Sequence, residues 1–129
     1  MAPRYTMKVV TDFAAAHALR GYEGPCARLH GHNWKVEVEV EASALDEVGM
    51  GLDFKVIKDA TRAVTGRLDH RNLNELAPFD ELNPTAENIA AHLYRELARR
   101  LDDERVRVRA VTVWETERAS VRYSEDPDR

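Results

Sequence analysis

The chain has 129 residues, which is enough for one domain with a buried core, and we expect residues 1–129 to form a single domain. An apolar fraction of 43% and a charged fraction of 33% are those of a folded globular protein and exclude a disordered chain. The formal net charge of −4 argues against a general nucleic-acid binder, which needs a basic face, but leaves room for a local basic pocket that binds an anion.

Cysteine content and hydropathy indicate the compartment. The single cysteine, Cys26, cannot form an internal disulfide, which fits a reducing environment. The first residues, Met1 to Tyr5, lack the apolar segment of a secretory signal, and no apolar run approaches the length of a transmembrane helix. We therefore expect a cytoplasmic protein with no membrane partner.

Two strands are predicted at the start of the chain. Residues 5–11 alternate in the manner of a strand, which we expect to continue as far as His17. A turn cluster at 20–25 contains two glycines and a proline. From Asn33 to Glu41 apolar and charged residues alternate, the period of a half-buried strand, and we expect this strand to begin near His30. The turn should return this second strand against the first.

Two helices follow. Asp53 is a suitable N-cap for a helix over 54–66, with an apolar stripe of Val56, Ile57, Ala60, Ala63 and Val64. A loop is expected at 68–74. Thr85 is the N-cap expected for a second helix that runs to about Leu101.

The chain then returns to strands. Residues 105–115 alternate, which predicts one face made of Val106, Val108, Ala110, Thr112 and Trp114 and another made of Arg107, Arg109, Val111, Val113 and Glu115. A tight hairpin at 116–118 leads into a strand over 119–123, and the tail 124–129 should fray. The order is ββααββ: an α+β domain with a four-stranded antiparallel sheet and two helices on one face. Its open edges predict pairing between subunits and hence an oligomer.

The segment from Cys26 to His32 carries the strongest chemical signal. His30 and His32 lie two residues apart on a predicted strand, so their side chains share one face roughly 6–7 Å apart. Two imidazoles so placed can bind one zinc ion at about 2.0–2.1 Å each. His17, at the end of the neighbouring strand, is a third candidate ligand. A thiol beside a metal has a lowered pKa, so Cys26 can act as nucleophile or base. We interpret the segment as a catalytic zinc site with a working cysteine.

Other interpretations of these residues stay open at this point. A His-x-His pair alone is a weak signal, and a histidine among alanines, such as His17, is more often a packed core residue than a ligand. Cys26 can instead be the fourth ligand of a closed structural zinc site. The Asp69-His70 pair in the loop is compatible with an Asx-type turn and a solvated histidine as well as with function.

Five short motifs occur in order: Phe13-x-x-x-His17, Cys26-x-x-x-His30-Gly31-His32-Asn33, Leu68-Asp69-His70-x-x-Leu73-Asn74, Pro84-Thr85-x-Glu87-Asn88 and Trp114-Glu115-Thr116. With them, the chain from about Met7 to Tyr123 resembles the 6-pyruvoyl-tetrahydropterin synthase family, most of all its bacterial 6-carboxy-tetrahydropterin synthase branch. The resemblance implies the tunnelling fold, in which three subunits close their sheets into a barrel and two trimers stack. It thus implies a homohexamer with active sites at subunit interfaces.

The resemblance also implies roles for single residues. His17, His30 and His32 match the three zinc ligands of the family, and Cys26 matches its catalytic cysteine. Asp69 and His70 match an acid/base pair contributed across a subunit interface. Glu115 matches the acidic residue that anchors the pterin ring; without the resemblance it would be an ordinary charge on a strand.

The short spacing between Cys26 and His30 resembles that of the carboxy-forming enzyme of queuosine and deazapurine biosynthesis. We therefore expect a zinc-dependent carbon–carbon lyase that converts 7,8-dihydroneopterin triphosphate to 6-carboxy-5,6,7,8-tetrahydropterin and releases acetaldehyde and triphosphate. The alternatives are a pyruvoyl-forming carbon–oxygen lyase of the tetrahydrobiopterin type and a non-catalytic zinc- or pterin-binding module. The sequence does not choose among the arginines that could bind the triphosphate.

Overall fold

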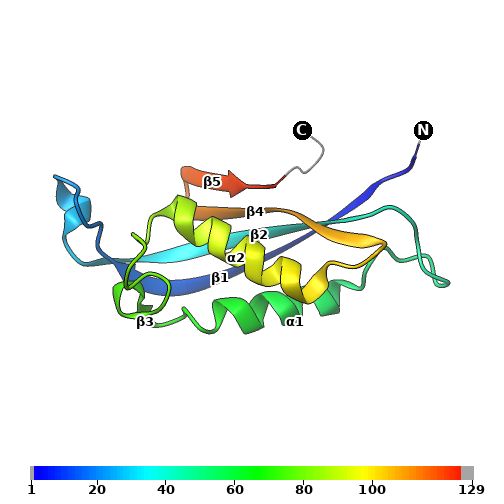
Figure 1. Ribbon diagram of the computed structural model, residues 1–129, viewed down its shortest axis with the longest axis horizontal. Helices are drawn as coiled ribbons and strands as arrows, with labels where there is room; N and C mark the ends of the chain where they lie inside the picture. Colours follow the sequence, from blue (N-terminus) through cyan, green and yellow to red (C-terminus); the bar gives the residue numbers. More distant parts are fainter. Residues whose placement is uncertain (1, 126–129) are drawn as a thin grey trace.

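The computed structural model describes residues 2–125 and forms one five-stranded sheet with two helices against one of its faces (Figure 1). Its strands are β1 (Tyr5–His17), β2 (His30–Ala42), β3 (Arg71–Asn72), β4 (Val106–Thr116) and β5 (Ala119–Tyr123), and its helices are α1 (Phe54–Thr65) and α2 (Ala86–Leu101). Two short 3-10 helices, η1 (Pro25–Ala27) and η2 (Leu73–Glu75), lie in connections. The end of the tail that we expected to fray, residues 126–129, lies outside the described residues.

The strand order in the sheet is β3-β1-β2-β4-β5. β1 and β2 form a long antiparallel pair whose register runs from Tyr5 opposite Ala42 to His17 opposite His30. The β2–β4 and β4–β5 pairs are also antiparallel. The predicted α+β class, with strands paired as hairpins and two helices on one face, is therefore confirmed.

The predicted four-stranded, wholly antiparallel sheet is wrong in one respect. The segment expected to be a loop at 68–74 contains β3, which pairs parallel to β1 beside Ala15 and Ala16. Two residues are too few to give a periodic signal. Two bonds to a residue far away in the sequence hold β3 there: the Asp69 carboxylate accepts the Ala14 N–H at 2.9 Å, and the His70 N–H donates to the Ala14 carbonyl at 2.6 Å.

The faces of β4 also differ from the prediction, because a bulge interrupts its pairing with β2. Ala110 lies opposite Glu39 and Val108 opposite Val40, so Arg109 is an extra residue between them. A single extra residue reverses the alternation of every residue beyond it.

The reversal decides which β4 side chains face the helices. Val106 and Val108 before the bulge, and Val111 and Val113 beyond it, belong to the same core, whereas Ala110 and Thr112 do not. Glu115 lies at a second irregularity, in the pairing of β4 with β5 between Trp114 and Thr116, and its carboxylate lies on the helix-covered side, 3.3 Å from the His32 ring. A bulge of this kind leaves no mark in a sequence that alternates throughout.

The helices begin where their caps predict. The Asp53 side chain accepts the Lys55 N–H at 2.8 Å, and the Thr85 hydroxyl accepts the Asn88 N–H at 3.1 Å. The stripe predicted for α1 is partly wrong: Val56 is 45% exposed, whereas Thr61 is fully buried because its hydroxyl donates to the Ile57 carbonyl at 2.7 Å. Neither helix of the described residues is long and apolar enough to cross a membrane.

The core lies between the sheet and the helices, and its largest fully buried side chain is Trp34. The indole stacks near the Phe13 ring, with 6.1 Å between centroids, and its N–H donates to the Ala15 carbonyl at 3.2 Å. Its edges contact the rings of His17 and His32 at centroid distances of 4.9 and 5.1 Å. The core and the histidines are thus parts of one packed layer.

Replacing Trp34 by alanine should destabilise the fold by about 3–5 kcal/mol, because it opens a large cavity and leaves the Ala15 carbonyl without its donor. Chemical denaturation at a fixed protein concentration measures the change. The matched control is Val48→Ala, at a side chain that is 70% exposed, which should change the free energy of unfolding by no more than about 0.5 kcal/mol. Equal effects of the two substitutions would contradict this account of the core.

Candidate metal and active site

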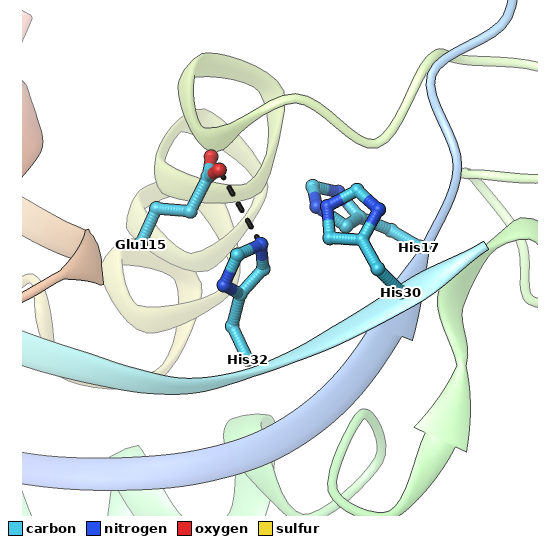
Figure 2. Close-up of side chains that lie close together, drawn as sticks. All are labelled: His17, His30, His32 and Glu115. Carbon is cyan, nitrogen blue, oxygen red and sulfur yellow. Dashed lines mark ion pairs between the residues drawn. The ribbon is translucent and has the colours of Figure 1, made fainter. Parts of the chain in front are cut away.

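Three histidines converge at one end of the sheet. His17 is the last residue of β1 and lies opposite His30, the first residue of β2, while His32 follows two residues later on the same face. Figure 2 shows the three rings gathered above the two strands. Their centroids are 4.6 Å apart for His17–His30, 4.8 Å for His30–His32 and 5.2 Å for His17–His32.

Hydrogen bonds fix the tautomers of two of these rings. The Nδ1 atom of His17 lies 2.7 Å from the Pro84 carbonyl oxygen, and the Nδ1 atom of His30 lies 2.7 Å from that of Arg28. A carbonyl oxygen only accepts, so each Nδ1 carries the proton, and in the neutral ring Nε2 keeps a free lone pair. Backbone carbonyls bonded in this way are typical of metal-binding histidines.

The Nε2 atoms of His17 and His32 are buried and have no hydrogen-bond partner among the described residues. Buried polar atoms without a partner are rare in folded proteins, because they have lost water without gaining a replacement. A metal ion is the partner that suits converging imidazole nitrogens. The residues therefore fit a metal site.

Burial lowers the pKa of His17 and of His32, and the negative charge of Glu115 partly opposes this in both rings. The net lowering favours the neutral imidazole. This is the form that binds a metal, since a protonated ring has no lone pair to offer.

Glu115 completes the cluster. Its carboxylate Oε1 lies 3.3 Å from Nε2 of His32, close enough for an ion pair but without the alignment of a hydrogen bond (Figure 2). The ligand atoms of His17, His30, His32 and Glu115 all lie within 4.8 Å of one another. The β4 bulge makes this possible, since it turns Glu115 to the side of the sheet that carries the histidines.

Cys26 lies apart from this group of ligand atoms. It is half-buried in η1, within the connection that joins β1 to β2. Its carbonyl accepts the Leu19 N–H at 2.9 Å, which ties the connection back to the end of β1. The described residues therefore do not place Cys26 as the fourth ligand of a closed structural site.

Asp69 and His70 form a pair of their own at the β1–β3 edge. The carboxylate of Asp69 lies 3.0 Å from Nδ1 of His70, whose side chain is 81% exposed and whose φ of 61° is in the left-handed region. His70 lines an open cavity of about 540 Å³ together with Arg71, Asn72 and residues 14–16 and 31–33 of β1 and β2, His32 among them. Within one chain this pair does not join the cluster of ligand atoms and faces outward instead.

Two asparagines that sequence reasoning left without a role lie next to the site. Asn74 and Asn83 each bond to the backbone that follows His17. Both stand in or beside the motifs quoted above, so the motif spacing was the signal that could have drawn attention to them. Arg20 is one of the arginines that the sequence leaves as candidates for binding the triphosphate, but its guanidinium donates to the Phe79 carbonyl at 2.8 Å.

A family model described as 6-pyruvoyl tetrahydropterin synthase matches residues 6–126, almost the whole chain. The chain belongs to this family. Its solved relatives include the 6-pyruvoyl tetrahydropterin synthase of Caenorhabditis elegans, which superimposes with a TM-score of 0.85 at 27% identity over 96% of this chain and 97% of that one.

Curated relatives in the family carry two kinds of name. A protein of Synechocystis sp. named 6-carboxy-5,6,7,8-tetrahydropterin synthase is 40% identical over 67% of this chain and 69% of its own length. A protein of Pyrococcus furiosus named dihydroneopterin monophosphate aldolase is 36% identical over 81% of this chain and 83% of its own. Family membership therefore confirms the resemblance without by itself choosing the reaction.

Replacing His17 by alanine should weaken zinc binding by more than the roughly 10–100-fold that loss of an outer-shell contact costs, because it removes a ligand atom. Titration against a chromophoric chelator measures the affinity. His92→Ala is the control, since His92 is half-buried against Phe79, 5.3 Å between ring centroids, and lies outside the cluster. Wild-type affinity in the His17 variant would rule out the site.

The Ala14 N–H lowers the pKa of Asp69, assisted by His70 and opposed by partial desolvation. A carboxylate with a lowered pKa stabilises the fold above its unfolded-state pKa of about 3.9, and that contribution is lost as the pH falls through the folded-state value. Asp69→Asn should therefore lower the Tm at pH 6, with a difference from wild type that shrinks below about pH 4. Thermal melts between pH 6 and 3 test this, with the exposed Asp80→Asn as control. A constant difference across this range would exclude the charge as its cause.

Proposed function

We propose that this protein is a zinc-dependent 6-carboxy-5,6,7,8-tetrahydropterin synthase that acts on 7,8-dihydroneopterin triphosphate in queuosine biosynthesis. The observation that carries the proposal is the convergence of three imidazoles beside Glu115, with the outer nitrogens of two of them bonded to backbone carbonyls. Family membership supports a tetrahydropterin synthase-type activity, and several curated relatives at 30–41% identity bear the carboxy-forming name.

His17, His30 and His32 are the residues that would hold the metal. Zinc bound there supplies a Lewis acid for an oxygen atom of the substrate side chain. Three neutral ligands leave the ion's full charge available and leave a coordination position for substrate. The wall formed by Trp34 excludes water from one side of the histidines.

Glu115 is the proposed anchor of the pterin ring. A carboxylate can accept two parallel hydrogen bonds from the amino group and the adjacent ring N–H of a pterin, which fixes its orientation as well as its position. Its oxygen lies 3.3 Å from the His32 ring. A pterin bound to Glu115 therefore lies directly beside the histidines, with its side chain within reach of them.

Proton transfers fall to Cys26 and to the Asp69–His70 pair in this proposal. Cys26, as thiolate, removes a proton from the substrate side chain. His70, oriented by the Asp69 carboxylate 3.0 Å away, accepts or delivers a proton near neutral pH. Because the side chain of His70 is 81% exposed and lies outside the group of ligand atoms formed by the histidines of its own chain, we propose that it acts in a site on another subunit.

The sheet supports such an assembly. β5 lies at one edge, and at the other edge β3 covers only Ala15 and Ala16 of β1. Most of the β1 edge therefore carries backbone groups that a neighbouring sheet can pair with. We propose the homohexamer of stacked trimers implied by the family resemblance, with sites completed at subunit interfaces.

The names of two relatives suggest alternative activities. The similar solved structure from C. elegans is named a 6-pyruvoyl tetrahydropterin synthase. The aldolase name of the P. furiosus protein points to cleavage of a monophosphate. By the resemblance, a glutamate in place of the cysteine accompanies aldolase-like variants, and this chain has Cys26.

Zinc-loaded protein incubated with 7,8-dihydroneopterin triphosphate should release acetaldehyde and form 6-carboxy-5,6,7,8-tetrahydropterin. An enzymatic aldehyde assay and chromatography of the pterins measure both products. A pyruvoyl product without acetaldehyde would replace the proposed reaction by the second candidate. The chelated protein is the control: it should remain folded by circular dichroism and lose activity, whereas a structural metal predicts unfolding.

Two variants separate the roles within the same assay. Cys26→Ala should bind zinc normally and lose turnover, and wild-type turnover in this variant would indicate a binding module. Glu115→Gln should raise KM while zinc affinity stays near wild type. A large loss of zinc affinity in Glu115→Gln would make Glu115 a metal ligand instead of the pterin anchor.

A further inference from the structure

Two asparagine side chains bind the backbone that leaves the metal site. The Ala18 N–H donates to Oδ1 of Asn74, and Nδ2 of Asn74 donates back to the Ala18 carbonyl, both at 2.8 Å. Asn83 does the same with Arg20: the Arg20 N–H donates to its Oδ1 at 2.9 Å, and its Nδ2 donates to the Arg20 carbonyl at 3.1 Å. Each carboxamide thus satisfies both polar groups of one residue.

Leu19, the residue between Ala18 and Arg20, forms its hydrogen bond on the opposite side of the chain. Leu19 donates its N–H to the carbonyl of Cys26 at 2.9 Å. Alternate residues bonded to alternate sides are the pattern of a strand inside a sheet. Beyond the end of β1, the two asparagines therefore replace one neighbouring strand and the Cys26 segment replaces the other.

The hydrogen bonds also fix which way each carboxamide points. Exchanging its oxygen and nitrogen would set a donor against the backbone N–H and an acceptor against the carbonyl. Among the common side chains, asparagine is the short one that offers a donor and an acceptor on one planar group. Aspartate has the same shape but only accepts, so it can keep one bond of each pair and not the other.

A chain of contacts leads from Asn83 to the metal ligand. The backbone carbonyl of Asn83 accepts Nδ2 of Asn88 at 2.9 Å, and the carbonyl of the next residue, Pro84, accepts the Nδ1 proton of His17 at 2.7 Å. Asn74, in turn, holds the residue directly after His17. The carboxamides thus hold the backbone on two sides of His17: Asn74 bonds to the residue that follows His17, and Asn83 directly precedes the proline whose carbonyl accepts the His17 Nδ1 proton.

We propose that Asn74 and Asn83 are positioning residues for the site, which orient the His17 ring and hold the backbone after β1 against the Cys26 segment. Neither residue touches the substrate or the metal. The role in catalysis rests on the proposed function, whereas the role in holding the backbone does not. Positions 74 and 83 both require a side chain that can donate one hydrogen bond and accept another.

Asn74→Asp and Asn83→Asp test the proposal, with Asn72→Asp as matched control. Asn72 uses its oxygen as an acceptor, from the Asn74 N–H at 3.1 Å, and aspartate can do the same. Within residues 2–125 its side chain makes one further hydrogen bond, from Nδ2 to Glu75 at 3.5 Å, which is at the limit of a hydrogen bond. The two test variants should lose zinc affinity on the order of tenfold, as outer-shell changes do, and the control should not.

Hydrogen exchange of the Leu19 amide gives a second readout that needs neither metal nor turnover. Measured in the chelated protein, exchange of this amide should be at least about tenfold faster in both test variants and unchanged in Asn72→Asp, because the bond to Cys26 is released. Thermal melts accompany both measurements. If aspartate prevents folding, Asn74→Ala and Asn83→Ala replace it, since they remove both bonds without adding a charge.

The outcomes are distinct. Faster Leu19 exchange and weaker zinc binding in the test variants support the proposal. A lower Tm with unchanged zinc affinity would overturn it and leave the asparagines a purely structural role, and unchanged Leu19 exchange would overturn it as well. If the wild type binds no zinc, the proposed function fails, while Leu19 exchange still shows whether the carboxamides hold the Cys26 segment.

Discussion

The site depends on the antiparallel register of β1 and β2, which sets His17 opposite His30. A shift of that register by one residue would turn one of the two side chains to the outer face of the sheet. The register is in turn fixed by burial, because Phe13 and Trp34 are paired on the same strands and face the same core. The packing that folds the protein is therefore also what brings the imidazoles together.

The core also makes the histidines chemically useful. Without metal, burying imidazoles against Trp34 costs free energy, since the Nε2 atoms of His17 and His32 lose water and find no partner among the described residues. The same burial lowers the pKa of both rings and keeps them neutral. The fold thus holds its ligands ready at some expense of stability, a common feature of functional sites.

The sequence predicted the features that repeat or that act locally. Alternation predicted β1, β2 and β4, the hairpin turn predicted β5, and single cap residues, Asp53 and Thr85, predicted the starts of both helices. It could not predict β3, whose two residues pair only after Asp69 bonds to Ala14, nor the bulge at Arg109, which changes the faces of β4 without changing its pattern. The bonds of Asn74 and Asn83 join residues more than 50 positions apart, so no local signal specifies them.

The bulge in β4 links the fold to the chemistry most directly. Had β4 kept a regular pairing with β2 up to Trp114, Glu115 would lie on the outer face with Arg107 and Arg109, as its alternation suggests. One extra residue brings the carboxylate to the histidines instead, at the end of the sheet where β4 turns into β5. Bulges are over-represented beside active sites because they redirect a side chain while the rest of the strand keeps its packing. Here the redirected group is the carboxylate of Glu115, so the bulge decides which ligand atoms the described residues offer to a metal ion.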